Sequence, residues 1–344
     1  MRLEACGTIF DLPQEDVTIT LTMRPYAGEA DLEAIANLIN ACEAVDRMDL
    51  GTSVPELRRS FEEPSVDKAH GIRLWEDAGG QLVGFARLWI PPAGEVIDGF
   101  LGFRVHPTAR GGDLEKQIVA WGEGRMREVS QERGVQVKLR SGTRADQSDR
   151  ITILESCGFK ADRYFFTMQR ALKASVEPLL CEPIPEPQLP EGFTLRQTKG
   201  EQDTEAWVEM YNQTFIDHWN HHDLTVERAN HFLSDPNYRP ELDLIAVAPD
   251  GMFAAFCYCE ISREDNARNG RHEGWITSLG TRRGFRRMGL GRAMLLSGMQ
   301  RLQAAGVEIA KLGVDAENPS GALRLYESVG FQKAYSSITY VKNL

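Results

Sequence analysis

Residues 286–293 of the chain read RRMGLGRA and lie between a strand-like run, EGWITSLG at 273–280, and the amphipathic run AMLLSGMQRLQAAG at 293–306. A strand that leads directly into a helix leaves the first N–H groups of that helix without partners and with partial positive charge. Gly289 and Gly291 let the backbone turn tightly and leave room for a bulky anion beside these amides. The stretch therefore predicts a phosphate site at a helix N-terminus.

Arg286, Arg287 and Arg292 add the positive charge that a polyphosphate needs. Two other phosphate loops fit less well. A P-loop ends in Gly-Lys-Ser/Thr, which is absent here, and the dinucleotide fingerprint needs a third glycine where Met294 stands. By itself the stretch fits an ordinary glycine-containing turn equally well, so its interpretation depends on the rest of the chain.

The chain repeats one layout of elements twice. Arg196 in the first strand of the second half lies 172 positions after Arg24 in the first strand of the first half. The same 172 positions separate Phe331, at the end of ESVGF, from Phe159, at the end of ESCGF. Two segments that share one order of elements and one spacing indicate a duplicated domain.

The domain boundaries follow from the prolines. Residues 171–191 hold five of the sixteen prolines and favour neither helix nor strand, so we expect a linker there between domains at 1–170 and 192–344. Each half starts with a short strand and an amphipathic helix, followed by two strands around a turn at 79–80 or 250–251. A strand, a helix, a strand, a short helix and a last strand follow. This order predicts an α/β fold with helices on both faces of a mixed sheet.

Composition is typical of a globular protein. No run approaches the ~18 apolar residues of a membrane helix. The start of the chain, MRLEACGTIFDLPQED, lacks the apolar core and cleavage site of a signal peptide, so we expect a cytoplasmic protein. The net charge of −11 and the lack of a basic stripe argue against a nucleic-acid partner.

The six cysteines, at 6, 42, 157, 181, 257 and 259, lack the spacing of a zinc site or a disulfide scaffold. Cys257 and Cys259 alternate along AAFCYCEI, so both are expected to face one side of a sheet as small apolar residues. In DHWNHHD, the residues His218, His221 and His222 would share one face of a helix and suggest a metal. We expect no metal, because no carboxylate or cysteine ligand is assigned and the segment is typical of a loop.

The stretch RRMGLG resembles the Arg/Gln-x-x-Gly-x-Gly/Ala loop of the GNAT acyltransferase superfamily, which wraps the pyrophosphate of coenzyme A in that family. Residues 317–331, with Glu-Asn-Pro and LYESVGF, are similar to a second family motif whose Asn and Tyr reach the cofactor. Tandem members such as mycothiol synthase are similar in length and layout. The resemblance covers both halves, and its motifs are strong in residues 273–331. It implies two tandem GNAT-like domains, each with a mixed, mostly antiparallel central sheet flanked by helices.

The resemblance also implies acetyl-CoA as the donor and assigns its contacts. The strand that ends in Leu279, Gly280 and Thr281 would pair with the pantetheine arm, and a backbone N–H there would stabilise the oxyanion of the thioester carbonyl. The other implied coenzyme A contacts are Arg286, Arg287, Met288, Gly289, Leu290, Gly291, Arg292, Asn318 and Tyr326.

Tyr326 and Glu273 are the implied catalytic residues. Tyr326 would protonate the departing thiolate, because a phenol with a pKa of ~10 is protonated at neutral pH. An amine must be neutral to attack, and Glu273 at the entry of the strand is the candidate base, acting directly or through water. The alternatives are that Tyr326 only packs on the core and that Glu273 is only a solvated residue at a strand end.

The acceptor is expected to be a primary amine of a small molecule or peptide. In GNAT folds the region between the first two helices lines the acceptor pocket, so the resemblance implies contacts from His218 and Trp219. The leading hypothesis is an acetyl-CoA-dependent N-acetyltransferase, a monomer or homodimer without a membrane partner. The alternatives are a longer acyl donor, a thiol or hydroxyl acceptor, and a coenzyme A-binding sensor or pseudoenzyme.

The first half lacks the residues proposed to act in the second. When Val105 is aligned with Thr281, acidic side chains replace the glycines of the loop, which adds bulk and negative charge where a phosphate would bind. The replaced positions are Asp113 opposite Gly289, Glu115 opposite Gly291, Leu154 opposite Tyr326, Asp146 opposite Asn318 and Ile97 opposite Glu273. We therefore expect residues 1–170 to form a GNAT-like scaffold that does not bind coenzyme A.

Overall fold

The structure, a computed structural model, describes residues 21–111, 113–173, 182–318 and 320–344. Its strands are β1 (Thr22–Pro25), β2 (Ile72–Glu76), β3 (Leu82–Trp89), β4 (Val96–Val105), β5 (Gln136–Arg144), β6 (Lys160–Ala171), β7 (Thr194–Gln197), β8 (Asp243–Val247), β9 (Phe253–Glu260), β10 (Glu273–Thr281), β11 (Ile309–Asp315) and β12 (Gln332–Asn343). Its α-helices are α1 (Glu29–Asp46), α2 (Val54–Glu62), α3 (Asp113–Arg133), α4 (Ser148–Ser156), α5 (Thr204–Phe215), α6 (Val226–Leu233), α7 (Arg263–Asn269), α8 (Leu290–Ala304) and α9 (Ala322–Glu327).

Some sequence predictions concern residues outside these ranges. They are the signal-peptide assessment at the N-terminus, Cys6, Cys181, Pro319 and residues 174–181 of the predicted linker. Residues 171–173 and 182–191 of that linker are described. Ala171 is the last residue of β6, so the linker starts after it, and the other described linker residues form no helix or strand. No helix in the described part of the chain has the length and apolar character needed to cross a membrane.

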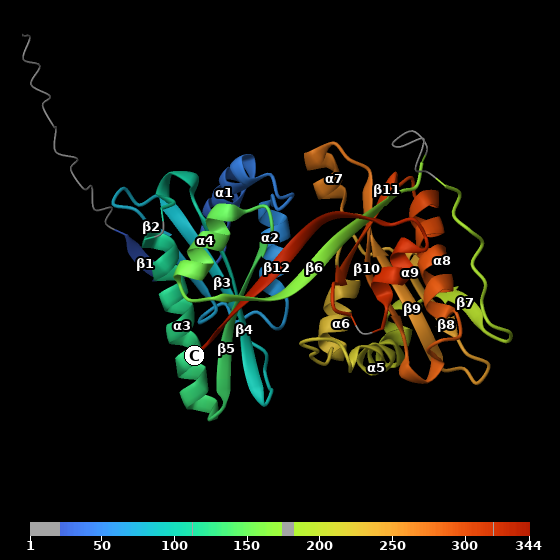
Figure 1. The fold of residues 1–344 in the computed structure, drawn as a ribbon. Helices are drawn as coiled ribbons and strands as arrows, with labels where there is room; N and C mark the ends of the chain where they lie inside the picture. Colours follow the sequence, from blue (N-terminus) through green and yellow to red (C-terminus); the bar gives the residue numbers. More distant parts are fainter. Residues whose placement is uncertain (1–20, 112, 174–181, 319) are drawn as a thin grey trace, which may run out of the picture.

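The strands form one sheet in the order β1-β2-β3-β4-β5-β12-β6-β11-β10-β9-β8-β7 (Figure 1). Within the described residues, only β4 with β5 and β10 with β11 run parallel. Helices cover both faces of the sheet in each half. In the first half, α1 and α2 cover one face, and α3 and α4 cover the other. In the second half α5 lies opposite α8 and α9. The predicted α/β fold with a mixed, mostly antiparallel sheet is confirmed.

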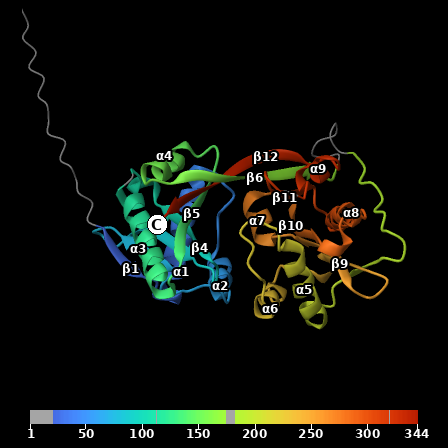
Figure 2. The ribbon, with the colours of Figure 1, turned by 60° about the horizontal axis from the view of Figure 1, so that its bottom comes forward.

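The last strands of the two halves are exchanged at the centre of the sheet. β12 lies between β5 and β6, and β6 lies between β12 and β11 (Figures 1 and 2). As a result, Ile338 and Tyr340 of the second half are buried in the core under α3, while Met168 and Leu172 of the first half are buried in the core under α8. The sequence indicates both last strands but not their exchange, which joins the halves through one sheet.

The two halves keep the same register in their parallel strands. Ile97 of β4 pairs with Val137 of β5, and Glu273 of β10 pairs with Ile309 of β11. α7 lies between β9 and β10, whereas residues 90–95 at the same place in the first half form no helix. The second half therefore carries an additional helix directly before the strand that was predicted to bind the donor.

Several local predictions agree with the structure. The hairpins around 79–80 and 250–251 form, and α8 buries the predicted periodic residues Leu295, Met299 and Leu302. Cys257 and Cys259 are both buried, with their Sγ atoms 3.7 Å apart.

The amphipathic helix predicted near the start of the second half, in the segment 203–219, ends at Phe215. The Asn212 side chain accepts a hydrogen bond from Leu224 N at 2.8 Å and donates one to Leu224 O at 3.0 Å. These bonds hold residues 216–225 as a loop that folds back on α5, which explains why the helical pattern does not continue.

Candidate functional site

The C-terminal part of β10 has one edge without a neighbouring strand. β10 pairs with β11 from Glu273 to Ile276, and beyond Ile276 the described strands separate. On its other side β10 remains paired with β9 as far as Thr281, with a bulge between Ile276 and Ser278. Backbone N–H and C=O groups along such an edge can bind an extended ligand as an additional strand. The predicted Leu279, Gly280 and Thr281 lie on this edge.

Arg286 anchors the loop between β10 and α8. Its Nε donates to Thr281 O at 3.3 Å, its Nη2 donates to Thr214 O at 2.8 Å, and its Nη1 lies 3.1 Å from Asp217 Oδ2. Arg110 makes a matching bond in the first half, from Nε to Val105 O at 3.1 Å. Because Arg286 already contacts two carbonyls and a carboxylate, its side chain fixes the loop, and a contact with phosphate stays a prediction.

The N-terminus of α8 has the features expected of an anion site. Gly289 is its N-cap residue and has φ of 88°, a left-handed conformation that favours glycine. No side-chain hydrogen bond caps the helix. Ala293 N donates to Gly289 O and starts the helical bonding, so the amides of residues 290–292 precede it. Arg287 and Met288 are exposed beside them. A diphosphate fits this arrangement.

Gly291 is the point where three elements meet. A Cβ atom at this glycine would lie 3.6 Å from Thr281 Oγ1 of β10 and 3.7 Å from Leu325 Cδ2 of α9. Arg292 Nη1 donates to Ser328 Oγ at 2.9 Å, which ties α8 to the end of α9. The open strand edge, the helix N-terminus and α9 are thereby held together in one place.

Tyr326 of α9 is 8% exposed and packs near Phe331. Burial raises the pKa of Tyr326 to about 12, so the phenol stays protonated at neutral pH. Asn318 lies in the turn before α9, where its Oδ1 accepts hydrogen bonds from Ser320 N at 2.8 Å and Ser320 Oγ at 2.5 Å. Both predicted residues therefore belong to the part of the second half that approaches α8.

Glu273 lies at the other end of β10, and its carboxylate contacts cations. Its Oε2 is 2.6 Å from Lys311 Nζ and 3.7 Å from Arg271 Nη1. Lys311 is buried on β11 and needs a negative partner there. Glu273 therefore has a structural role as a counterion, in addition to the catalytic role predicted for it.

Glu260 at the end of β9 was missed by the sequence analysis. It pairs across the sheet with Trp275, so its side chain shares a face with Glu273. Burial, together with Asp235 and other carboxylates nearby, raises the pKa of Glu260. The available signal was a single acidic residue at the end of the apolar run AAFCYCEI.

His218 and Trp219 lie in the loop after α5, at the junction of the two halves. The Trp219 ring is 5.6 Å from the Phe165 ring, and the guanidinium carbons of Arg140 and Arg163 lie 4.9 and 5.4 Å from its centroid. His218 Nδ1 is 3.0 Å from Trp219 O. In the described residues no group of three His, Cys, Asp or Glu side chains is arranged to hold a metal.

In the first half an arginine fills the corresponding gap between strands. β4 pairs with β5 only as far as Phe100, as β10 does with β11 up to Ile276. Arg150 Nη1 donates to Phe103 O at 3.2 Å, and its guanidinium carbon lies 3.5 Å from the centre of the Phe103 ring. Burial lowers the pKa of Arg150 to about 9. Phe103 precedes Val105 by two residues, as Leu279 precedes Thr281, so a side chain occupies the edge that is open in the second half.

The two acidic replacements in the first-half loop differ in their surroundings. Glu115 is buried, whereas the Asp113 side chain is 97% exposed. Glu115 therefore places its carboxylate inside the fold, at the position that Gly291 leaves free in the second half.

Comparisons with known proteins agree with this geometry. Residues 204–331 match the model of the acetyltransferase (GNAT) family. The mycothiol acetyltransferase of Thermobispora bispora is 28% identical over 326 residues, which cover 94% of this chain and 99% of that protein. The mycothiol acetyltransferase of Salinispora tropica is 27% identical over 94% of this chain and 96% of its own length.

Solved structures show the same layout. A GCN5-related N-acetyltransferase from Sphaerobacter thermophilus has a TM-score of 0.70 and 26% identity, covering 94% of this chain and 95% of that one. A tandem GNAT protein from the clavulanic acid biosynthesis pathway shares the fold with a TM-score of 0.67 at 13% identity, covering 94% and 98%. Residues 204–331 therefore match the acetyltransferase (GNAT) family, and over its whole length the chain is similar to tandem GNAT proteins in its layout of two halves.

Proposed function

We propose that the second half transfers an acetyl group from acetyl-CoA to a primary amine of a small molecule or peptide, by direct attack in a ternary complex. One observation carries this proposal: the open edge of β10, the uncapped N-terminus of α8 and helix α9, which carries Tyr326, are held together around Gly291. A coenzyme A sensor would need the diphosphate site alone and would leave the buried Tyr326 phenol without a role.

The donor site follows from these elements. The amides of Leu290, Gly291 and Arg292 would bind the diphosphate, with the exposed Arg287 adding charge. Residues 279–281 would bind the pantetheine arm through their backbone, and Asn318 would reach the donor from the turn before α9. When bound, acetyl-CoA would supply a thioester carbonyl that the amine converts to an amide, with release of the thiol.

The protons move between this chain's residues and the reactants. A backbone N–H on the open edge of β10 would polarise the carbonyl oxygen. Glu273, directly or through water, would accept the proton that the attacking amine loses. Tyr326 would donate its phenolic proton to the departing sulfur, and its pKa of about 12 keeps that proton in place at neutral pH.

The first half, residues 1–170, is proposed not to bind coenzyme A. Arg150 contacts Phe103 where an arm would pair, and Glu115 is buried where the diphosphate would approach. The loop that carries His218 and Trp219 is proposed to contribute to the acceptor site, because it lies where the halves meet. Unchanged acceptor kinetics in His218→Ala and Trp219→Ala would rule out that contribution.

The test is an assay of acetyl-CoA consumption over a panel of amines, run beside Tyr326→Phe. The panel includes amino-sugar thiols, because relatives at 27–28% identity are named mycothiol acetyltransferases. We expect turnover with at least one amine, and loss of turnover with retained acetyl-CoA binding in the variant. Equal turnover in Tyr326→Phe would show that another group or water protonates the thiolate.

A further inference from the structure

The additional helix α7 connects Glu273 to the first half of the chain. Asn266 of α7 bonds the backbone of Glu273 twice: its Nδ2 donates to Glu273 O at 2.8 Å, and its Oδ1 accepts from Glu273 N at 2.9 Å. The position of β10 at its entry therefore depends on the position of α7.

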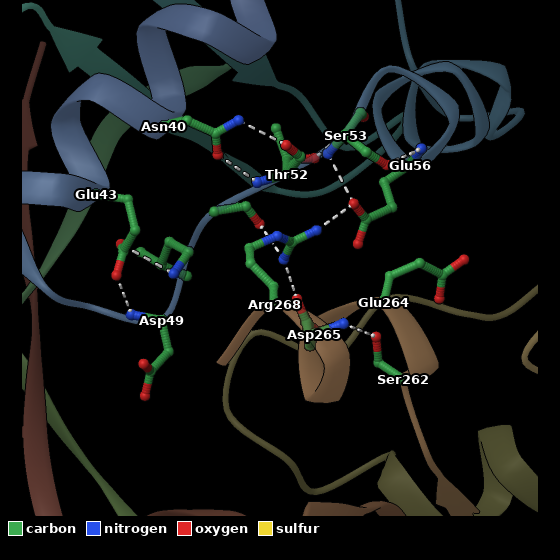
Figure 3. Close-up of polar contacts among 12 residues, drawn as sticks. Asn40, Glu43, Asp49, Thr52, Ser53, Glu56, Ser262, Glu264, Asp265 and Arg268 are labelled. Atoms are coloured by element: carbon green, nitrogen blue, oxygen red, sulfur yellow. Dashed lines mark hydrogen bonds and ion pairs between the residues drawn. The ribbon is translucent and has the colours of Figure 1, made fainter. Parts of the chain in front are cut away.

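The first half holds α7 through a docked loop (Figure 3). Arg268 of α7 pairs with Glu56 at 2.5 Å and donates to Gly51 O at 2.9 Å. Glu56 is itself fixed, because its carboxylate accepts from Ser53 N at 2.7 Å as part of a capping box at the start of α2. Two charged residues on α7 and α2 are thus held in one geometry across the junction.

The same loop places Asp49 in a single conformation. Asp49 has φ of 60°, which is uncommon for a residue other than glycine. The Glu43 carboxylate accepts from Asp49 N at 2.8 Å and from Leu50 N at 3.0 Å, and Asn40 bonds both backbone groups of Thr52 (Figure 3). Such conformations persist where the surroundings determine them strongly, and they often serve a function.

Asp49 and Glu273 share one arginine. Arg271 Nη1 lies 2.6 Å from Asp49 Oδ2 and 3.7 Å from Glu273 Oε2, the oxygen that Lys311 contacts at 2.6 Å. We propose that Asp49 of the first half is a positioning residue. Its ion pair with Arg271 keeps the guanidinium from moving closer to the Glu273 carboxylate, so that Lys311 remains the nearer cation. This inference rests on the proposed function, in which Glu273 accepts the proton of the amine.

The consequence concerns how readily Glu273 takes up a proton. A second cation in direct contact would stabilise the carboxylate and weaken it as a base. Glu260 on β9, which pairs with Trp275, lies on the same face of the sheet and carries a charge of the opposite sign to these cations. The first half therefore takes part in the reaction through charge placement, without touching either substrate.

The test is a double-variant cycle on the full chain, read by ¹³C NMR of the Glu273 carboxyl group. Its resonance is assigned by its loss in Glu273→Gln and followed over a pH titration. In Asp49→Ala, Arg271 turns to Glu273, and we expect the titration midpoint to fall by about 0.5 pH unit or more. Asp49→Asn keeps the shape of the side chain and should act in the same direction. In Asp49→Ala/Arg271→Ala the midpoint should return to near the wild-type value.

The control is Glu29→Gln, which removes an exposed carboxylate whose partner Arg58 lies within the first half. It should leave the midpoint unchanged. A midpoint in both Asp49 variants equal to the wild-type one, or a double variant shifted as far as the single one, would overturn the proposal. Undiminished turnover in Glu273→Gln would instead count against the proposed base, and the titration cycle would still test the positioning of charge.

Discussion

Gly291 and Glu115 occupy corresponding positions in the two halves. They differ in the space that they leave for a ligand at the N-terminus of α8 and of α3. Around Gly291 an added Cβ atom would meet only ordinary van der Waals contacts, at 3.6 and 3.7 Å. The corresponding Glu115 side chain is buried. A small side chain therefore fits at this position of the second half, whereas an acidic one would place a carboxylate beside the proposed diphosphate site.

Gly291→Glu should abolish acetyl-CoA binding, because it adds a carboxylate beside the proposed diphosphate site. Like charges about 4 Å apart at an effective dielectric of about 20 repel by roughly 4 kcal/mol, before screening and relaxation. Calorimetric titration with acetyl-CoA measures the effect. Gly291→Ala is the matched control and should bind within a few-fold of the wild type. Binding by the Glu variant at wild-type affinity would place the diphosphate elsewhere.

Tyr326 should not limit the reaction on the basic side of neutrality. Since burial raises its pKa to about 12, the phenol keeps its proton from neutral pH to about pH 10. The pH profile of the wild-type kcat at saturating acetyl-CoA should show no decline below about pH 10. A decline near pH 9 would contradict the assignment of Tyr326 as a fully protonated acid.

Asp243 at the start of β8 should make stability depend on pH. Burial raises its pKa to about 6, although the Thr198 and Tyr238 hydroxyls donate to its Oδ2. Since the native pKa lies above the unfolded value of about 3.9, stability is highest with Asp243 protonated and falls as pH rises from about 4 to 6. The free energy of unfolding of Asp243→Asn, relative to that of the wild type, should therefore rise by about 2 kcal/mol between pH 4 and pH 7. Denaturant unfolding of both proteins measures this difference. A constant difference across that range would argue against a buried charge.

At the scale of elements, the sequence predicts those helices, strands and turns that depend on residues close together in the chain. The glycines and arginines of 286–292 predict the loop and the start of α8, and apolar periodicity predicts that helix and both hairpins. The sequence does not predict the hydrogen bonds of Arg286 to Thr214 and Asp217. These partners lie about 70 positions earlier in the chain, in α5 and the following loop. Arg150 is missed for the same reason, since its contact with Phe103 joins residues 47 positions apart.

Among the described residues, the three α-helices that the sequence analysis did not identify are α2, α6 and α7, and all are short. Helices of seven to nine residues carry little periodicity, and their stability comes from their contacts rather than from propensity. Ion pairs between the halves involve all three: Arg59 with Glu264, Arg228 with Glu63, and Arg268 with Glu56. Raising the salt concentration should weaken these exposed or half-exposed pairs.

Arg268→Ala should loosen α7 more than it lowers global stability. The substitution removes the bond to Gly51 O and the pair with Glu56, and Glu56 retains its capping bond to Ser53. Hydrogen exchange should increase in α7 and in the loop around residue 50, with a change in the free energy of unfolding of about 1 kcal/mol or less. Unaltered exchange in both segments would show that the junction does not depend on this arginine.

At the scale of the whole molecule, the exchange of β6 and β12 makes each half depend on the other. Ile338 belongs to the last strand of the chain but is buried among residues of the first half. The register of β12 with β5 and β6 involves pairs 163 to 205 positions apart in the chain, beyond the reach of any local pattern. At the centre of the sheet, the order of the strands in space therefore differs from their order in the sequence.

Ile338→Ala should destabilise the first half, although the residue lies near the C-terminus. Truncation of a buried isoleucine usually lowers the free energy of unfolding by about 2–4 kcal/mol. Hydrogen exchange followed by mass spectrometry should show the loss of protection in α3 and β5, which share its core. Loss of protection confined to the second half would mean that the strands are not exchanged.

The central claim is that the helix N-terminus near residue 290 binds the diphosphate of one acetyl-CoA per chain and that the first half binds none. Calorimetry combined with hydrogen exchange in the presence of acetyl-CoA tests it most directly. We predict one equivalent bound, with new protection at residues 279–292 and no change at 113–118. A second bound equivalent, or protection at 113–118 in place of 279–292, would contradict the account.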